Sequence, residues 1–466
     1  MASLEQGEQR REHMLMDPVG KLIPAVALPS IISMLVGAIY NMADTFFVGK
    51  LGNSATGAVG IVFPIMNLLQ ALAFMFAHGA TSYVSRLLGK GDVENASRTV
   101  STAAISALLL GALYGAVGIL FLHPLLAFFG ATPTILPYAG KYALYIYIAS
   151  PLFAASYVFN NTLRAEGSPV LALVGMSSGA VLNIILDPIC IFALNMGVAG
   201  AGFATMIGQI VGFSMLLSFY LRKKGRVSAL TLSFKLFTPT KPMMGEILRI
   251  GIPSFIRSGM NSVAAIMLNT AAAPYGDAAI AAFSVVTRIL FLVNAALIGY
   301  GQGYQPISGF NYGAGRFDRV RKAFWFTIES AMVAMVLFAA ILIVFAPQMV
   351  GIFRNDPDVL GVGVQALRWQ AATLPLMGAS LLASMLFQST GHAMPAFVIS
   401  LARQGLCFVP FILLLPALYG EKGLVAAQSA ADIVAFLITI PLLLRVLKHL
   451  KDEPGKEPIG ELDTIE

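Results

Sequence analysis

The sequence predicts an all-α polytopic membrane protein whose twelve transmembrane helices form two homologous six-helix lobes, related by a pseudo-two-fold axis along the membrane normal. Three observations support this fold class: a strongly apolar composition, long apolar runs, and a pattern of glycine and proline that repeats along the chain. Of the 466 residues, 57% are hydrophobic and only 11% are charged. A soluble domain carries about 25% charged residues, so this composition suits contact with lipid.

The apolar runs have the length that a membrane requires. A helix that crosses the hydrocarbon layer needs about 20 mostly apolar residues. A proline inside such a helix removes one backbone hydrogen bond, so Pro24 and Pro29 predict a bend or a static kink early in the first span. The twelve runs cover residues 22–48, 57–82, 99–122, 138–161, 169–194, 198–221, 247–273, 279–308, 323–346, 362–389, 396–419 and 424–447.

The two halves of the chain repeat one another after a shift of 224 residues. Matching glycines and prolines indicate shared backbone geometry. Six spans per repeat, an even number, give both halves the same orientation, as in transporters built from parallel repeats. The matched pairs are Gly79 with Gly303, Gly89 with Gly313, Pro151 with Pro375, and Gly167 with Gly391. The expected domains are an N-terminal segment (1–21), a first lobe (22–221), a linker (222–246), a second lobe (247–447) and a C-terminal tail (448–466).

Positive charge predicts the orientation. Of the 30 Lys and Arg residues, 22 fall in loops and termini on one side of the predicted membrane, five fall on the other side, and three lie within spans. Loops rich in Lys and Arg stay in the cytoplasm, so both termini, the linker and the tail are expected there. This asymmetry accounts for the net charge of +7 without a nucleic-acid partner.

Polar residues inside the spans predict a functional site in the first lobe. A carboxylate in hydrocarbon costs roughly 2.5–3.5 kcal/mol even on the lenient insertion scale, so it requires partners. Two carboxylates and their neighbours lie at similar depth on three helices, in pairs four residues apart that share a helix face. Together they could offer hard oxygen ligands to a cation, or share a proton. The alternative is that the acids pair with basic groups or cap helix ends. The pairs are Tyr40 with Asp44, Asn183 with Asp187, and Thr205 with Gln209.

The second lobe lacks this set. The position that matches Asp44 is Leu268, and the one that matches Asp187 falls in an apolar run at 411–415. Glu329 and Asp432 are expected to form interhelix ion pairs or to face an aqueous cleft rather than to couple transport. The remaining charges within its spans are Arg257, Arg288 and Arg403, and the histidines His78 and His392 are expected at the polar edges of cytoplasmic loops.

Three segments resemble the multidrug and toxic compound extrusion (MATE) family. They are Met42-Ala43-Asp44-Thr45-Phe46-Phe47-Val48-Gly49, Arg164-Ala165-Glu166-Gly167-Ser168-Pro169 and Asn183-Ile184-Ile185-Leu186-Asp187-Pro188, and the resemblance spans residues 20–447. It implies a Na⁺- or H⁺-coupled antiporter of a bacterial inner membrane that exports small organic cations, including drugs, through a cleft between the lobes. No cofactor besides the coupling ion and no partner chain are implied, so a monomer in membrane lipid is expected.

The resemblance also implies which residues bind the coupling ion. In the bacterial branch with its cation site in the amino-terminal lobe, the matching ligands are Asp44, Asn183, Asp187 and Thr205, for either Na⁺ or H⁺. The surrounding hydrogen-bond network matches Tyr40, Tyr142 and Asn160, to which the helix-face argument adds Gln209. The NorM-like branch is known for acidic cation ligands in the second lobe. This sequence has no carboxylate in the corresponding part of its seventh or tenth span.

Two other functions remain open from the sequence. A flippase for lipid-linked precursors, from the same superfamily, should line its cleft with basic residues, and Arg257, Arg288 and Arg403 keep that alternative open. An intramembrane enzyme is the least favoured reading, because the sequence has no HExxH run, no paired acidic run and no glycine-rich phosphate loop. We therefore expect a transporter and not an enzyme.

Overall fold

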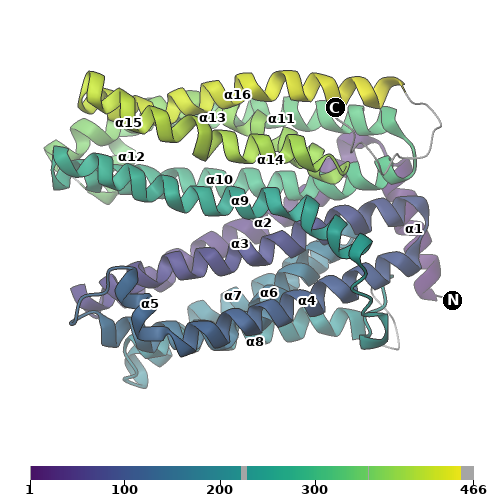
Figure 1. Cartoon of the computed structure of the whole chain (residues 1–466), viewed down its shortest axis with the longest axis horizontal. Helices are drawn as coiled ribbons and strands as arrows, with labels where there is room; N and C mark the ends of the chain where they lie inside the picture. The colour runs from purple at the N-terminus through teal and green to yellow at the C-terminus, as the bar shows by residue number, and fades with distance from the viewer. Residues whose placement is uncertain (1, 222–227, 355, 453–466) are drawn as a thin grey trace.

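The computed structural model describes residues 2–221, 228–354 and 356–452, and this part of the chain is helical with no strand. Figure 1 shows two bundles of long helices that lie against each other at the end of the molecule that carries the N-terminus. We call this end the α1 end. The first lobe contains α2 (Val19–Gly49), α3 (Asn53–Lys90), α4 (Val93–Leu120), α6 (Leu136–Ala165), α7 (Pro169–Pro188) with the π-helix η1 (Ile189–Ala193), and α8 (Val198–Leu221).

The second lobe has the same plan. Its long helices are α9 (Lys241–Ala272), α10 (Asp277–Gly313), α11 (Phe317–Val344), α13 (Pro357–Ser389), α14 (Ala393–Leu401) with the π-helix η4 (Ala402–Cys407) and α15 (Phe408–Tyr419), and α16 (Glu421–Asp452). The short elements are α1 (Ala2–Met16), α5 (Leu122–Phe128) and α12 (Ala346–Phe353), and two 3₁₀ turns, η2 (Phe234–Leu236) and η3 (Ala273–Tyr275).

Eleven of these helical segments are long and apolar enough to cross a membrane. The twelfth long helix of the described chain, α9, has 32 residues and lies alongside the others. It is absent from the apolar set because polar side chains such as Arg257 and Asn261 lower its mean hydropathy. The all-α fold that the sequence predicts is therefore confirmed, with α9 as the long helix of the described chain that falls outside the apolar set.

Glycines set how closely the lobes approach at the α1 end. A Cβ atom on Gly79 of α3 would overlap the carbonyl oxygen of Ile247 on α9. A Cβ on Gly89 of α3 would overlap the carbonyl oxygen of Phe310 on α10, and one on Gly313 of α10 would overlap that of Arg86 on α3. The 224-residue shift relates Gly89 to Gly313 and Arg86 to Phe310, so each of these last two contacts is the repeat equivalent of the other. A pseudo-two-fold axis between α3 and α10 requires this equivalence. The repeated glycines of the sequence thus mark the seam between the lobes.

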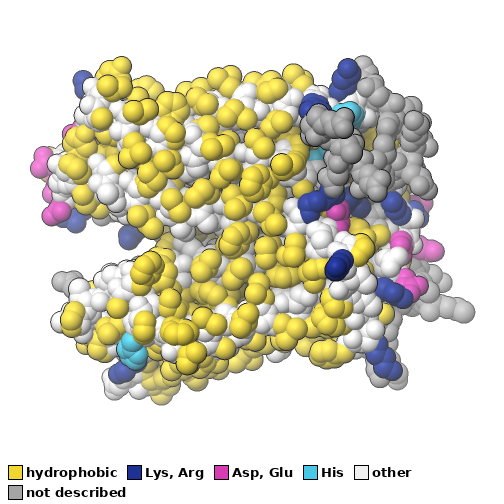
Figure 2. Space-filling model, viewed as in Figure 1, with side chains coloured by type: hydrophobic (Ala, Val, Ile, Leu, Met, Phe, Trp, Pro, Cys, Tyr) yellow, Lys and Arg dark blue, Asp and Glu magenta, His cyan; other side chains and the backbone are white. Residues whose placement is uncertain are grey.

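At the opposite end the lobes separate. Figure 2 shows a notch between them that opens at the end away from the N-terminus. Gly37 of α2 and Gly259 of α9 have no atom within 4 Å of the place where a Cβ would lie. One hydrophobic core at the α1 end includes residues of both lobes, such as Ala77 and Tyr304, whereas two further cores belong to one lobe each. The structure is therefore closed at the α1 end and open at the other.

The helix α1 ties the lobes together at the closed end. Arg11 donates from Nε and Nη2 to the carbonyl oxygens of Leu88 and Gly89 on the first lobe, at 3.1 and 3.0 Å. From the second lobe, Asn311 Nδ2 donates to the carbonyl oxygen of Met14 at 3.2 Å. Two further arginines of that lobe bond the same end of α1: Arg316 donates to Leu15 O at 2.7 Å and Arg319 to Asp17 O at 2.8 Å. Bonds to both lobes make α1 a strap across the seam.

Candidate cation site

Asp44 lies near the end of α2 and faces α6. Its side chain is 5% exposed, and the Tyr142 hydroxyl donates a hydrogen bond to Asp44 Oδ2 at 2.7 Å. Tyr142 itself is 1% exposed. The structure thus joins one expected ligand to one expected member of its surrounding network.

The other three expected ligands meet on α7 and α8. Asn183 and Asp187 are one helical turn apart on α7, and Asn183 Nδ2 donates to Asp187 Oδ1 at 3.3 Å and to Thr205 Oγ1 of α8 at 3.2 Å. The two helices approach closely because Gly179 has no Cβ. A Cβ at this position would overlap the carbonyl oxygen of Gly208 on α8. Hydrogen bonds thus join the expected ligands of α7 and α8 to each other and Asp44 of α2 to α6, and the role of these residues as cation ligands stays a prediction.

The site contains more acceptor oxygens than donors. Asp44 Oδ1, Asp187 Oδ2 and Asn183 Oδ1 are buried and have no hydrogen-bond partner in the described part of the chain. Asp44 and Asp187 lie on helices α2 and α7, which pack against each other, and no described Lys or Arg pairs with either acid. Buried polar atoms are nearly always satisfied in proteins. A bound cation or proton would satisfy these oxygens, so the donor set fits Na⁺ or H⁺.

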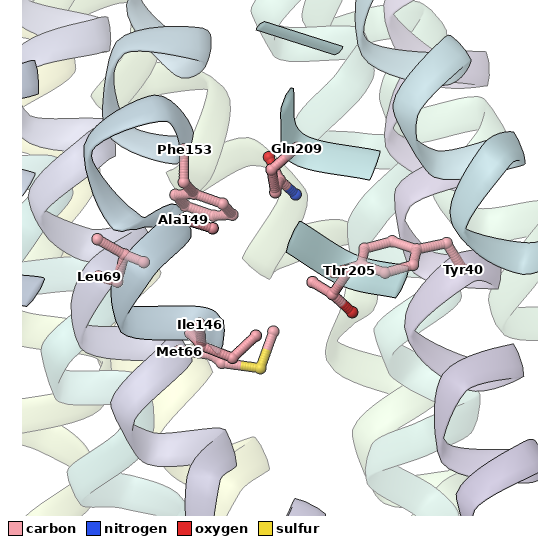
Figure 3. A pocket seen from close by; sticks show the side chains of 8 residues that line it. All are labelled: Tyr40, Met66, Leu69, Ile146, Ala149, Phe153, Thr205 and Gln209. Carbon is pink, nitrogen blue, oxygen red and sulfur yellow. The ribbon is translucent and has the colours of Figure 1, made fainter. Parts of the chain in front are cut away.

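A small cavity adjoins the site within the first lobe. It has a volume of about 20 Å³, which is room for one water-sized group. Figure 3 shows Tyr40 and Thr205 on one side of this cavity and Met66, Ile146 and Phe153 on the other. The cavity places Tyr40 and Gln209 beside the expected ligand Thr205. Its lining residues are Tyr40, Met66, Leu69, Ile146, Ala149, Phe153, Thr205 and Gln209.

Asn160 lies in a different network. Its Oδ1 accepts from Arg164 Nη2 at 2.6 Å, and its Nδ2 donates to the carbonyl oxygen of Ala172 at 2.7 Å. Among the described residues it forms no hydrogen bond to Asp44 or Asp187. The resemblance implied a place for Asn160 around the cation site, whereas these bonds join it to the contact between the lobes.

That contact is a buried polar network, which the sequence analysis missed. Arg164 Nη1 donates to Gln302 Oε1 at 2.6 Å, and Gln302 Nε2 lies 3.5 Å from His78 Nε2. His78 Nδ1 lies 2.8 Å from Ser254 Oγ, which donates to Gln388 Oε1 at 3.3 Å. The chain of contacts crosses from α6 and α3 to α9, α10 and α13. It closes the cleft at its base.

Two expectations are corrected here. His78 was expected at a loop edge, and Arg164, which lies beyond the predicted span 138–161, was one of the 22 Lys and Arg residues assigned to loops and termini, but each is 1% exposed inside the molecule. Local sequence could not show that a facing lobe covers both residues. The repeat could have indicated that these residues lie at the contact between the lobes. His78 and Gln302 are related by the 224-residue shift, and each precedes a glycine of the seam.

In the second lobe, the buried acid Asp432 forms an ion pair. Asp432 Oδ1 accepts from Arg403 Nε at 2.7 Å and from Gln428 Nε2 at 3.1 Å. This matches the interhelix pairing expected of Asp432. Glu329 is exposed on α11, and Arg288 is exposed on α10.

Comparisons with known proteins agree with this architecture. The family model MatE matches residues 29–189 and 253–414, one segment in each lobe. The multidrug export protein MepA of Staphylococcus aureus (strain MSSA476) is 29% identical over 428 residues, covering 90% of this chain and 93% of that protein. A crystal structure of MATE in complex with MaL6 aligns with a TM-score of 0.90 at 26% identity, covering 95% of this chain and 99% of that chain. An outward-facing multidrug resistance MATE family transporter of the MOP superfamily aligns with a TM-score of 0.89 at 26% identity, covering 95% and 98%.

Proposed function

Because the chain belongs to the MATE family of transporters, we propose that it is a multidrug efflux antiporter that exports small organic cations in exchange for Na⁺ or H⁺. Family membership confirms the resemblance seen in the sequence, and with it a multi-pass membrane transporter rather than an enzyme. MepA, a relative named for multidrug export, supports drugs as the cargo. We further propose that the protein acts as a monomer in a bacterial inner membrane.

The observation that carries the coupling proposal is the pair of carboxylates in the first lobe. Asp44 Oδ1 and Asp187 Oδ2 are buried acceptors without described partners, on helices that pack against each other. Loading the site with Na⁺ or H⁺ neutralises part of this charge and removes the repulsion between the two acids. Release of the ion restores the repulsion, so ion binding changes the relative stability of two arrangements of α2 and α7.

The orientation follows from the charged loops. The described basic residues Arg11, Arg316 and Arg319 lie at the α1 end, where they form hydrogen bonds at the contact between α1 and the two lobes, and we assign this end to the cytoplasm. The open notch then faces outward, where exported compounds leave and coupling ions enter. Rocking of the two lobes about the seam would close the notch and open the cytoplasmic end.

The electrical balance limits the exchange ratio. One monovalent cation that moves inward releases roughly 2.3 kcal/mol per 100 mV, and one monovalent drug cation that moves outward costs the same. A one-for-one exchange is therefore driven by the chemical gradient of the coupling ion alone. Two carboxylates in one site permit more than one coupling charge per cycle.

The test is dye transport in proteoliposomes, with a Na⁺ gradient or a pH gradient imposed separately. We expect one gradient to drive a permanently cationic dye, and Asp44→Asn and Asp187→Asn to abolish gradient-driven transport. Glu94→Gln is the matched control, because Glu94 is an exposed acid that pairs with Arg98 at 2.7 Å. Normal transport by Asp44→Asn under both gradients would show that this site does not couple the ion.

A further inference from the structure

A groove between α11 and α16 opens on the surface of the second lobe, away from the cation site. Its volume is about 730 Å³, which lies within the range of about 300–1,000 Å³ of pockets that bind small molecules. α11 begins at the α1 end, where Arg316 just before it donates to Leu15 O of α1. α16 ends there, because its residues Val446 and Leu450 belong to the core shared by both lobes. The groove therefore lies along the part of these two helices nearest to the α1 end.

Basic side chains line the end of the groove nearest to α1. Lys322 lies in the second turn of α11 and Lys448 in the second-last turn of α16, and both are exposed. Neither forms an ion pair with an acid in the described part of the chain, and neither does Glu329, which lines the groove further along α11. The other two charges of the lining neutralise each other, since Arg321 Nη2 lies 2.9 Å from Asp318 Oδ1. With three basic and two acidic residues, the lining has an excess of one positive charge.

Apolar side chains line the deeper part of the groove. Trp325 is 47% exposed and lies about one turn beyond the lysine of α11, and Leu444 is exposed one turn before the lysine of α16. Phe326 also lines the groove, and its Cε2 atom would lie 3.5 Å from a Cβ on Gly20 of α2, so the groove borders a contact between the lobes. A tryptophan between lysines and leucines is typical of the level at which lipid headgroups meet acyl chains.

We propose that this groove binds an anionic phospholipid of the leaflet that meets the α1 end, with its phosphate at Lys322 and Lys448 and its acyl chains against Trp325 and Leu444. Ammonium groups form strong, charge-assisted hydrogen bonds with phosphate oxygens, and basic pockets between membrane helices on the cytoplasmic side recognise anionic headgroups in this way. Phosphatidylglycerol carries one net negative charge and neutralises the lining, whereas phosphatidylcholine has no net charge. In the orientation proposed above this is the cytoplasmic leaflet, but the lipid site depends on neither the coupling ion nor the cargo.

Trp325 supplies a reporter inside the groove. The chain has two tryptophans, and the other, Trp369, lies on α13. In Trp369→Phe the fluorescence therefore comes from Trp325 alone, and a lipid with brominated acyl chains quenches it only when that lipid lies in contact with the ring. The test places Trp369→Phe in vesicles of phosphatidylcholine and phosphatidylglycerol in equal amounts, with bromine on one lipid or on the other. We expect stronger quenching when phosphatidylglycerol carries the bromine.

Charge variants in the same background test the recognition of the headgroup. Lys322→Gln and Lys448→Gln should each lower the preference for phosphatidylglycerol about fivefold. Glu329→Gln should change the preference in the opposite direction, because it removes a negative charge from the lining. Lys90→Gln is the matched control, since Lys90 is an exposed lysine at the same end of the first lobe and lies outside the groove.

Equal quenching of Trp325 by the two brominated lipids would overturn the proposal, as would an unchanged preference in both lysine variants. Greater relief of quenching by inorganic phosphate than by chloride at equal ionic strength would assign the lysines to a soluble anion and also contradict it. A preference found only in a chain that is ended at Asp452 would mean that the acidic residues after this position, and not lipid, fill the groove in the full chain. None of these measurements requires transport, so their outcome is independent of the proposed export function.

Discussion

The Tyr142 hydroxyl donates a 2.7 Å hydrogen bond to Asp44 Oδ2, and the other carboxylate oxygen of Asp44 has no partner in the described chain. The bond fixes Asp44 on the α6 side and leaves Oδ1 free for an ion. The bond also links α2 to α6, so a change in the charge of Asp44 alters a contact between these two helices of the first lobe. Under the proposed coupling role of Asp44, this geometry predicts that Tyr142 is a positioning residue for the candidate cation site.

Tyr142→Phe should weaken ion coupling without abolishing it. A hydrogen bond to a charged group contributes about 1.5–3 kcal/mol, which corresponds to roughly tenfold or more in affinity. We therefore expect the driving-ion concentration for half-maximal transport to rise by about that factor. Tyr114→Phe is the control, because it removes a phenol that bonds the Ile65 carbonyl oxygen at 2.8 Å in the same lobe. An unchanged ion dependence in Tyr142→Phe would contradict this role.

Gly79→Ala should loosen the seam between the lobes. The added Cβ meets the backbone of Ile247, which cannot move aside as a flexible side chain could. Overpacking of this kind costs about 1–3 kcal/mol. We expect a lower thermal unfolding midpoint and faster maleimide labelling of a cysteine placed at Ser82, which lies at the base of the cleft and bonds the Gln388 carbonyl oxygen.

Gly37→Ala provides the comparison for the seam. It makes the same chemical change in a long helix, where no atom lies within 4 Å of the new Cβ. Alanine favours helix over glycine by about 1 kcal/mol, so this variant should be as stable as the parent or more stable. Equal destabilisation by both substitutions would mean that the Gly79 contact is not the cause.

Releasing α1 should favour the state that opens at the α1 end. Arg11→Ala removes two bonds to the first lobe, and Arg316→Ala removes the bond to Leu15 from the second. We expect spin labels at Lys90 and Lys322, exposed at this end on opposite lobes, to show a larger population of long distances in each variant. Arg98→Ala, which breaks only an exposed pair with Glu94, should leave the distances unchanged. The same distances in all three variants would exclude α1 as a strap.

Glu166 should make stability fall as pH rises toward neutrality. It lies just beyond α6, where burial raises the pKa of this carboxyl to about 7 despite Arg10 at 3.8 Å and a hydrogen bond from Ser228. Between its ordinary pKa of 4.5 and about 7 the folded protein binds more protons than the unfolded chain. The stabilisation is therefore complete below the lower value and is lost as pH rises through the higher one.

Glu166→Gln removes this titration. We expect the unfolding midpoint of the parent protein to fall between about pH 4.5 and about pH 7, and that of Glu166→Gln to change less over the same range. Glu94→Gln, an exposed acid near the same end, should keep the slope of the parent. Identical slopes in the parent protein and Glu166→Gln would show that Glu166 is not the group responsible.

Much of the fold could be predicted from local sequence. Apolar runs of membrane length, the bias of Lys and Arg, and the 224-residue repeat are properties of short segments or of their order. Asp44 and Asp187 were also identifiable, because an acid within a long apolar run is costly wherever the helix packs. The spacing of Asn183 and Asp187 fixed their shared helix face before any packing was known.

Contacts between segments could not be predicted in this way. Which residue bonds to Asp44, and whether Asn160 joins the cation site or Arg164, depends on how helices rotate and pack. His78 looks like a loop-edge residue because only the facing lobe buries it, through Ser254 and Gln302. Arg257 looks like one of several arginines until its lack of a described partner distinguishes it from Arg403.

The sequence by itself determined that this chain is a two-fold repeated bundle of membrane helices with two acids inside the predicted spans of its first lobe. Hydropathy and helical periodicity depend only on residues near one another in the chain, so they can be read without coordinates. The tertiary structure alone decided which end is closed, which glycines form the seam, and which polar side chains remain without partners. Those features depend on distances between helices far apart in sequence, which the packing of the two lobes sets.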